Sequence, residues 1–276
     1  MKQRTIAKEV RFAGKALQTG KHVVMTCRPG IEGEGIVFTR TDIADAAPIK
    51  LGELMSSSSN RRRTTIGLGK VQVQTVEHLL AALWALGIDN LIIDIAGAEL
   101  PAMDGSALGF LTPLKEAGTT EQGMERRSIK ITEPIMITNG DRSISIVPDD
   151  VFSVSYSIDY KVACIGKEEF HIVPDMDSFE KDIAPARTFC LMREAALLFL
   201  TGLGRGATFN NTLILGNKGP VGTKFRIPNE PIRHKILDLI GDLYMLGRPI
   251  IGKVIAKKSG HALNAEVVKQ IAEKYI

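Results

Sequence analysis

The chain has 276 residues, of which 44% are hydrophobic and 24% are charged, and its net charge is +4. This composition is typical of globular proteins with a packed core and excludes an intrinsically disordered chain. The small positive charge suits an anionic small substrate and is too weak, by itself, to indicate a nucleic-acid-binding protein.

Cysteine usage and the apolar stretches bear on the cellular compartment. The three cysteines are widely spaced, which favours reduced thiols, and the opening MKQRTIAKEVRF lacks the apolar region of a secretory signal. The longest apolar stretch, residues 79–88, is about half as long as a bilayer-spanning helix. We therefore expect a soluble, cytoplasmic protein without a transmembrane segment.

The first part of the chain predicts strands followed by one helix. Residues 4–50 are short runs of alternating polar and apolar residues separated by glycine and proline, which is typical of hairpins. Residues 75–87 (TVEHLLAALWALG) predict a helix with Thr75 as its N-cap and Gly87 as its C-terminal stop. A buried strand is expected at residues 90–95.

The same order recurs in the second part of the chain. Residues 128–160 again predict strands, and residues 231–246 (PIRHKILDLIGDLYML) predict an amphipathic helix from Pro231 to Gly247. An apolar strand follows at residues 250–256. Because both parts run from strands through a histidine-bearing helix to an apolar strand, we predict an α+β fold. Two related domains, each a sheet layered with helices, would face each other across the site.

We place the first domain at residues 1–120 and the second at 127–276, with a polar, glycine-containing linker at 116–127. Residues 56–65 (SSSSNRRRTT) indicate an exposed loop, with an anion contact as the alternative. Residues 202–206 (GLGRG) resemble a phosphate-binding loop, but no helix opened by Lys-Ser or Lys-Thr follows, so we do not predict nucleotide binding there.

The second predicted helix carries a polar stripe. His234, Asp238 and Asp242 are spaced four residues apart, so they lie one above the other on one helix face. Such a stripe can be a solvated or salt-bridged face, although such faces more often carry lysine and glutamate. A histidine and an aspartate one turn apart are also good metal ligands.

Glu77 and His78 supply the complementary part of a hydrolytic site. In HExxH peptidases, a glutamate beside a histidine ligand acts on the metal-bound water without binding the metal. Here Ala82 replaces the second histidine, so His78 must share its metal with distant residues. Together with His234 and Asp238 it would leave one position open for water, as catalytic zinc requires. Alone, His78 would be a satisfied histidine at a helix start.

His261, in the turn KSGHALN, can lie over such a site because the preceding glycine permits close backbone approach. A carboxylate partner would favour its protonated form, and Asp242 is the candidate. Amide hydrolysis needs a general acid beside a general base, since the amine leaves only when protonated. Lys235 adds a donor and positive charge next to His234.

Five segments occur in order along the chain: TVEHLLAAL, ELPAMDGSA, ARTF, RHKILDLIGDL and KSGHALN. Together they resemble the UDP-3-O-acyl-N-acetylglucosamine deacetylases, the zinc amidases of lipid A biosynthesis, essentially from end to end. The resemblance implies two α+β domains. It also implies hydrolysis of the N-acetyl group of UDP-3-O-(3-hydroxyacyl)-N-acetylglucosamine, which releases acetate in the committed step of that pathway.

By motif position, the resemblance implies roles for individual residues. The implied zinc ligands are His78, His234 and Asp238. Glu77 would be the general base, and His261, tuned by Asp242, would protonate the leaving amine. Thr188 would help to hold the oxyanion, and Lys235 would face the anionic substrate.

The remaining implied residues contact the substrate. Tyr160 and Phe189 would flank the sugar and nucleotide, and an apolar insert near residues 190–206, including Leu191, would line a passage for the acyl chain. The chain departs from the family pattern at Gln18, Arg63 and Leu191. The resemblance therefore does not predict the preferred acyl-chain length.

Two other functions fit parts of the pattern. A non-haem iron oxygenase also uses two histidines and a carboxylate, so Fe²⁺ is an alternative to Zn²⁺, although the glutamate and third histidine favour hydrolysis. A nucleic-acid-binding protein would use Arg61, Arg62 and Arg63 but would leave the His/Asp stripe unexplained. We expect a monomeric metal-dependent amidohydrolase that acts on a UDP-linked acylated amino sugar, with no nucleic-acid partner.

Overall fold

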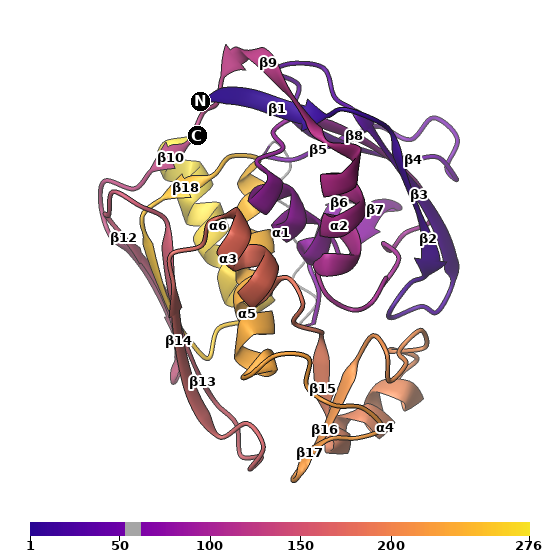
Figure 1. Cartoon of the computed structure of the whole chain (residues 1–276), viewed down its shortest axis with the longest axis vertical. Helices are drawn as coiled ribbons and strands as arrows, with labels where there is room; N and C mark the ends of the chain where they lie inside the picture. The colour runs from indigo at the N-terminus through magenta and orange to yellow at the C-terminus, as the bar shows by residue number, and fades with distance from the viewer. Residues whose placement is uncertain (53–61) are drawn as a thin grey trace.

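The computed structural model describes residues 1–52 and 62–276 and consists of two five-stranded sheets with helices between them (Figure 1). The first sheet has the order β2 (Val10–Lys15), β3 (His22–Pro29), β8 (Leu91–Ala96), β4 (Ile36–Arg40) and β5 (Ile49–Lys50). The second has the order β11 (Ile135–Asn139), β12 (Arg142–Val147), β19 (Lys253–Lys257), β13 (Ser153–Asp159) and β14 (Lys167–Ile172).

The two sheets have the same topology. In each, the central strand, β8 or β19, pairs antiparallel with a hairpin strand on one side and parallel with β4 or β13 on the other. Helices precede and follow the central strands: α1 (Glu77–Leu86) and α2 (Leu108–Ala117) in the first half, α5 (Glu230–Leu243) and α6 (His261–Tyr275) in the second. The predicted α+β fold of two related units is therefore confirmed.

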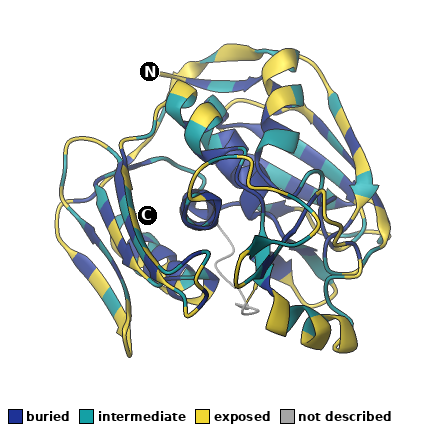
Figure 2. Cartoon of the chain, turned by 60° about the horizontal axis from the view of Figure 1, so that its bottom comes forward, coloured by how far each residue is buried: buried dark blue, intermediate teal, exposed yellow. Residues whose placement is uncertain are grey.

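Smaller elements connect and extend these halves. Short pairs are formed by β1 (Lys2–Ile6) with β9 (Thr119–Glu125), β6 (Thr65–Leu68) with β7 (Val71–Gln74), and β10 (Ile129–Lys130) with β18 (Ile250–Ile251). The second half also contains α3 (Met176–Ser178), α4 (Met192–Leu200) and a sheet of β15 (Phe189–Leu191), β16 (Leu213–Gly216) and β17 (Gly219–Pro220). Buried residues concentrate where the central helices face each other and the sheets, whereas α4 is largely exposed (Figure 2). Within the described ranges, no helix is both long and apolar enough to cross a membrane.

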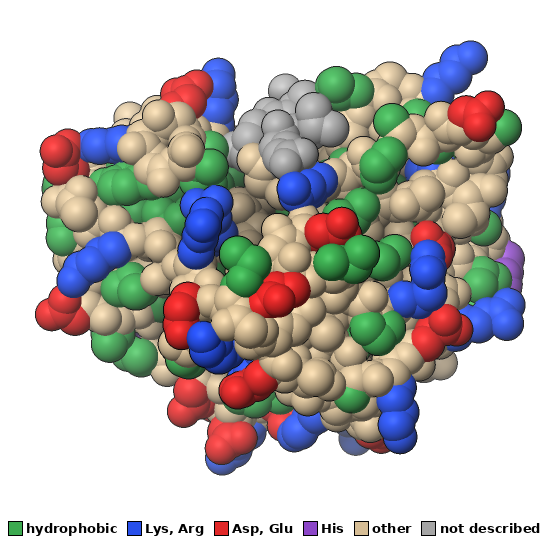
Figure 3. All heavy atoms as spheres, turned by 90° about the horizontal axis from the view of Figure 1, so that it is seen from above, with side chains coloured by type: hydrophobic (Ala, Val, Ile, Leu, Met, Phe, Trp, Pro, Cys, Tyr) green, Lys and Arg blue, Asp and Glu red, His purple; other side chains and the backbone are tan. Residues whose placement is uncertain are grey.

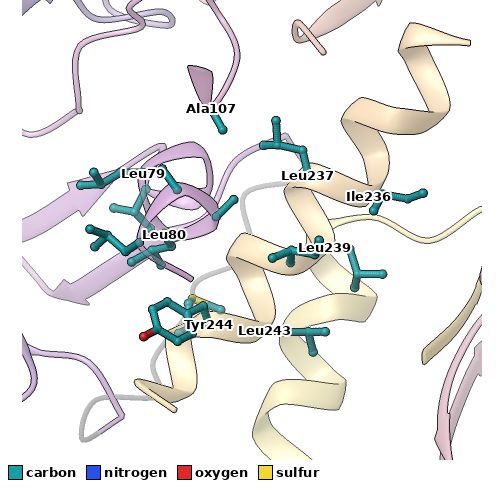
Figure 4. Close-up of a cluster of buried hydrophobic side chains, with 14 of the residues drawn as sticks. Leu79, Leu80, Ala107, Ile236, Leu237, Leu239, Leu243 and Tyr244 are labelled. Carbon is teal, nitrogen blue, oxygen red and sulfur yellow. The ribbon is translucent and has the colours of Figure 1, made fainter. Parts of the chain in front are cut away.

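Helices α1 and α5 pack directly against each other at the centre of the molecule. Leu79, Leu80 and Leu237 are fully buried within this cluster (Figure 4). Gly241 faces the first residue of α1, and a Cβ added to it would lie 2.0 Å from the carbonyl oxygen of Glu77. Because any side chain there would overlap the neighbouring backbone, glycine is what allows the two helices to approach so closely.

The two ends of α1 differ in how well they agree with the predicted N-cap and C-terminal stop. Thr75 is not the N-cap: the helix begins at Glu77 after Val76, with no side-chain cap, and Thr75 has a left-handed backbone (φ 58°) and donates its hydroxyl to Glu99 instead. Gly87 is confirmed as the C-terminal stop, with φ 66°.

Three other segments differ from prediction. The predicted linker at 116–127 contains β9, which returns to pair with β1. The predicted strand at 250–256 is interrupted at Gly252, where φ is 156°, so β18 and β19 belong to different sheets. The second helix begins at Glu230, one residue early, and its end is a 3₁₀ turn before Gly247.

Candidate active site

The start of α1 and the middle of α5 bring His78, His234 and Asp238 together. The Oδ1 atom of Asp238 lies 3.6 Å from Nε2 of His78 and 3.3 Å from Nε2 of His234. The two imidazole rings stand nearly perpendicular, with centroids 5.0 Å apart. All three side chains are buried, and their ligand atoms lie within 4.8 Å of one another. This geometry suits three ligands of one metal ion.

His234 is prepared to act as a ligand through Nε2. Its Nδ1 lies 3.0 Å from the carbonyl oxygen of Ala186, which can only accept, so Nδ1 carries the proton and donates it. The Nε2 lone pair is then directed at the cluster. Burial lowers the pKa of His234 to about 4, against the opposing effect of Asp238, so the imidazole is neutral near pH 7.

Asp238 is held in its charged form. Burial would raise the pKa of this carboxyl, but His234 and Lys235 hold it well below its usual value. The Nζ atom of Lys235 donates to Oδ2 of Asp238 at 3.1 Å. Burial would lower the pKa of Lys235, and the Asp238 carboxylate outweighs this and raises it. The lysine is therefore a fixed positive charge beside the cluster.

His261 is the first residue of α6 and lies next to the cluster. Its Nδ1 lies 2.9 Å from Oδ2 of Asp242, and its Nε2 lies 3.9 Å from Oε1 of Glu77 and 3.8 Å from Oδ2 of Asp238. Burial would lower the pKa of His261, but these carboxylates, led by Asp242, raise it to about 9. The imidazole is therefore a proton donor near pH 7.

Glu77, the first residue of α1, is almost fully buried beside His261. Its Oε2 accepts the backbone N–H of Thr64 at 3.1 Å. Burial raises the pKa of Glu77 despite the opposing charge of His261. A carboxylate with a raised pKa is a better proton acceptor than an ordinary one, so Glu77 and His261 form an acid–base pair next to the ligand cluster.

A second group of side chains, Glu77, Asp238 and His261, also has the geometry to hold a metal ion. His78, His234 and Asp238 are the better set, because two imidazoles and one carboxylate match catalytic zinc sites. Using His261 as a ligand would also require loss of the proton that its carboxylate neighbours favour.

Two residues that support Asp242 were missed in the sequence. The hydroxyl of Thr64 donates to Oδ1 of Asp242, and the side-chain amide of Asn264 donates to Oδ2 at 2.8 Å. Ser259 in turn donates to the amide oxygen of Asn264 at 2.7 Å. Asn264 and Ser259 lie in the quoted motif KSGHALN, so their proximity was visible, whereas Thr64 is distant in sequence and reaches the site only through the fold.

A cavity of about 410 Å³ opens beside the cluster and is lined from both halves. It reaches every predicted site residue except Asp242, which lies behind His261. The predicted oxyanion-holding residue Thr188 lines it, and so do the predicted substrate-contacting residues Tyr160, Phe189, Leu191 and Lys235. The rings of Tyr160 and Phe189 meet edge to face with centroids 5.8 Å apart. The cavity also reaches Leu198 and Glu194 of α4.

The residue Thr188 is positioned by a buried ion pair. The neighbouring Arg187 donates from its backbone N–H and its Nε to Oε1 of Glu230, the first residue of α5, both at 2.9 Å. The N–H of Thr188 donates to the carbonyl of Gly105 at 2.8 Å. Gly105 has φ 79°, and a Cβ there would overlap the carbonyl oxygen of Asn211. The glycine in MDGS therefore supports the segment that carries Thr188 and leads into β15.

The departures from the family pattern have structural explanations in part. Gln18 lines the cavity and accepts the N–H of Gly204 at 3.1 Å, so it fixes the 202–206 loop. No helix follows that loop, in agreement with the absence of a predicted phosphate-binding loop. Arg62 lines the cavity and pairs with Glu194, whereas Arg63 is not among the lining residues. Most of the segment 56–65 lies outside the described residues.

Comparison with known proteins places this chain in a family. The sequence model of the UDP-3-O-acyl N-acetylglycosamine deacetylase family matches residues 3–273. A UDP-3-O-acyl-N-acetylglucosamine deacetylase of Myxococcus xanthus is 39% identical over 98% of this chain and 86% of its own length. The corresponding protein of Acidithiobacillus ferrooxidans is 39% identical over 98% and 90%, and that of an Anaeromyxobacter species 36% over 98% and 88%. With this coverage, and with residues of four of the five quoted motifs lining one cavity, the chain belongs to the UDP-3-O-acyl-N-acetylglucosamine deacetylase family.

Proposed function

We propose that this chain is a metal-dependent amidohydrolase that removes the N-acetyl group of UDP-3-O-(3-hydroxyacyl)-N-acetylglucosamine and releases acetate, the committed step of lipid A biosynthesis. The observation that carries the proposal is the buried set of His78, His234 and Asp238, with Glu77 and His261 directly beside it. The family membership and the cavity support the same substrate class.

The donor set fits Zn²⁺, and Fe²⁺ also suits two imidazoles and a carboxylate. His78 and His234 would bind through Nε2, and Asp238 through Oδ1, since these atoms already converge. When bound, the metal supplies Lewis acidity for the amide carbonyl and lowers the pKa of a water molecule.

The chain's own residues carry the proton transfers. Glu77 takes the proton of the attacking water, because its carboxylate is buried and its pKa is raised. Protonated His261, held by Asp242, donates to the amide nitrogen so that the amine can leave. Thr188 lines the cavity and donates its hydroxyl to the developing oxyanion.

The rest of the cavity accounts for the size and chemistry of the substrate. Lys235 is a fixed cation at the lining and would face the anionic part of the substrate. Tyr160 and Phe189 form an aromatic corner that would flank the sugar and nucleotide. Leu191 and the segment 190–206 would line the passage of the acyl chain, because Leu191 and Leu198 both border the cavity.

We also propose that the enzyme acts as a monomer in the cytoplasm. One chain supplies every side chain of the proposed site, and its three cysteines are all unpaired, as in a reducing compartment.

The test is deacetylation of UDP-3-O-acyl-N-acetylglucosamine by the zinc-reconstituted protein and by Glu77→Gln, with bound metal measured by elemental analysis. We expect turnover by the wild type and a loss of about 10²- to 10⁴-fold in kcat for the variant, with metal retained. Asp94→Asn, which changes a carboxylate paired with Arg28 on the first sheet, is the matched control. Absence of turnover by the metal-loaded wild type at several acyl lengths would contradict the proposal, and oxygen-dependent turnover would favour an iron oxygenase.

A further inference from the structure

Helix α4 exposes most of its apolar side chains. It has no buried residue, although seven of its nine residues are Ala, Leu, Met or Phe. The most exposed are Leu197, Phe199 and Leu200, at 64%, 71% and 81%. Large apolar side chains that protrude together from a soluble fold mark an interaction surface. Figure 2 shows the exposed face of α4 at the edge of the molecule.

Further exposed apolar side chains follow in the longer segment 189–229, which contains α4 and is called the insert from here on. Phe209 and Phe225 are 48% and 37% exposed, and Met192 at the start of α4 is 46% exposed. Within the described residues, the insert thus holds six of the fifteen exposed large hydrophobic side chains. This concentration distinguishes residues 189–229 from the rest of the surface.

The net positive charge of the protein arises in the same insert, because the insert contains few acidic residues. Residues 189–229 contain five of the 35 basic residues, namely Arg193, Arg205, Lys218, Lys224 and Arg226, but only one of the 31 acidic residues. The net charge of +4 therefore belongs to this segment, and the rest of the chain is balanced. The single acid, Glu194, is paired with Arg62. By contrast, the face seen from above carries acidic and basic side chains next to each other (Figure 3).

The exposed helix is continuous with the cavity. In Figure 1, α4 lies at the periphery, next to the small sheet of β15, β16 and β17. The first of these strands begins at Phe189 and leads directly into α4. Leu198 of α4 and Leu191 of β15 line the cavity, while Leu197, Phe199 and Leu200 point away from it into solvent. The part of the cavity lining that α4 supplies thus includes the apolar Leu198, together with Glu194, which pairs with Arg62.

We propose that α4 and the basic residues of the insert dock on the surface of an anionic lipid bilayer. The apolar side chains of α4 would enter the boundary between head groups and acyl chains, and Arg193, Arg205, Lys218 and Lys224 would pair with lipid phosphates. Arg226 is paired with Asp104 and is not counted among them. One short helix buries little area, so the binding is reversible and weakens as salt is added. The proposal does not depend on deacetylase activity, because binding is measured without turnover.

Charge distinguishes a bilayer from a second copy of this chain. Two inserts facing each other would place two segments of net charge +4 in contact, which disfavours self-association. An anionic bilayer offers both the negative charge and the apolar interior that this surface matches.

The first test is flotation of the full-length, metal-loaded protein with vesicles of phosphatidylethanolamine and phosphatidylglycerol, and with vesicles of phosphatidylcholine alone. We expect co-flotation with the anionic vesicles and little with the zwitterionic ones. The double variant Phe199→Ser/Leu200→Ser should bind at least about tenfold more weakly, because two exposed side chains lose their burial in lipid. Removing cations, as in Arg205→Gln/Lys218→Gln, should weaken binding about fivefold per charge.

The matched control is Met136→Ser/Val173→Ser, which removes two exposed apolar side chains, 66% and 54% exposed, in the second half but outside the insert. Its vesicle binding should equal that of the wild type. Both double variants replace solvent-exposed residues, and circular dichroism and the thermal midpoint will verify that they are folded.

Three results would overturn the proposal. The wild type could fail to float with anionic vesicles, or the α4 variant and the control could lose binding equally. In the third, light scattering would show a wild-type dimer that Phe199→Ser/Leu200→Ser converts to a monomer without a change in vesicle binding. That result would assign the surface to a second copy of the chain.

Discussion

The two halves of the molecule share one sheet topology but contribute differently to the site. The first half supplies Glu77 and His78 from the first turn of α1. The second supplies His234 and Asp238 from α5 and His261 from the start of α6. A single cluster therefore needs both halves, and neither α1 nor α5 alone holds a complete ligand set.

The segments that follow the two central strands show the difference most directly. After β19, the chain leads to His261, whose Nε2 lies 3.9 Å from Oε1 of Glu77 next to the ligand cluster. After β8, the corresponding segment leads to Glu99, whose carboxylate accepts the backbone N–H groups of Gln18 and Thr19 at 2.8 and 3.0 Å. The same place in the topology thus positions a candidate proton donor in one half and ties down a loop in the other.

The largest effect is expected from removing a ligand in either half. His78→Ala and His234→Ala should each abolish stoichiometric metal binding and reduce activity to background, because the remaining two ligands do not hold the ion. Elemental analysis and the deacetylation assay measure this. His22→Ala, an exposed histidine of β3, serves as the control and should keep both. If only one of the two ligand variants lost the metal, the prediction that both halves supply ligands to one metal ion would be wrong.

Substitutions in the segments that follow β19 and β8 should affect different quantities, namely catalysis in the first case and stability in the second. His261→Ala should lower kcat by about 10²- to 10⁴-fold with metal retained. Glu99→Ala leaves the donors of Gln18, Thr19 and Thr75 without their acceptor, so it should reduce the free energy of unfolding by about 1–3 kcal/mol. Urea unfolding and steady-state kinetics distinguish the two. If Glu99→Ala lowered kcat as much as His261→Ala does, the two segments would not differ in function as proposed.

A smaller effect is expected from the residue that holds His261. Asp242→Asn keeps the shape of the side chain but removes the charge beside Nδ1 of His261. We expect a loss of about 10- to 100-fold in kcat, as for other residues that orient a site through a neighbour. Metal content should be unchanged. Activity equal to that of the wild type would show that His261 does not depend on this carboxylate.

The smallest expected effect concerns the contact between the halves. Gly241→Ala forces a methyl group against the carbonyl of Glu77 and should cost about 1–3 kcal/mol of stability. Gly260→Ala, where an added Cβ meets nothing within 4 Å, is the matched control. Unfolding curves of the two variants compare them directly. Equal stability would mean that α1 and α5 can separate without cost.

Much of the candidate site was predictable because its residues are close in sequence. The spacing of His234 and Asp238 on one helix face, and the adjacent Glu77 and His78, are local patterns that helix geometry translates directly into space. The role of Gly241 could not be predicted in this way. Within ILDLIGDL the sequence indicates only a residue of low helix propensity, because the role of this glycine depends on the backbone of another helix.

The errors in the predicted fold have the same origin. Thr75 has the residue type of an N-cap, but its hydroxyl donates to Glu99. Glu99 lies 24 residues away in the sequence, so the local pattern around Thr75 does not include it. The segment 116–127 has the composition of a linker because its strand β9 is an exposed edge partner of β1, with few buried side chains to produce an apolar pattern. In both cases a tertiary partner decided the local structure.

The return of the chain through β9 has a consequence for motion. Before it enters the second half, the chain is hydrogen-bonded to β1 of the first, and directly afterwards β10 pairs with β18 of the second. Only residues 126–128 lie between these pairings, and the N–H of Arg126 among them donates to the carbonyl of Met1. The helices α1 and α5 also approach closely at Gly241. The halves therefore form a preorganised frame that does not open like a clamshell, and a substrate has to reach the cavity from its open side.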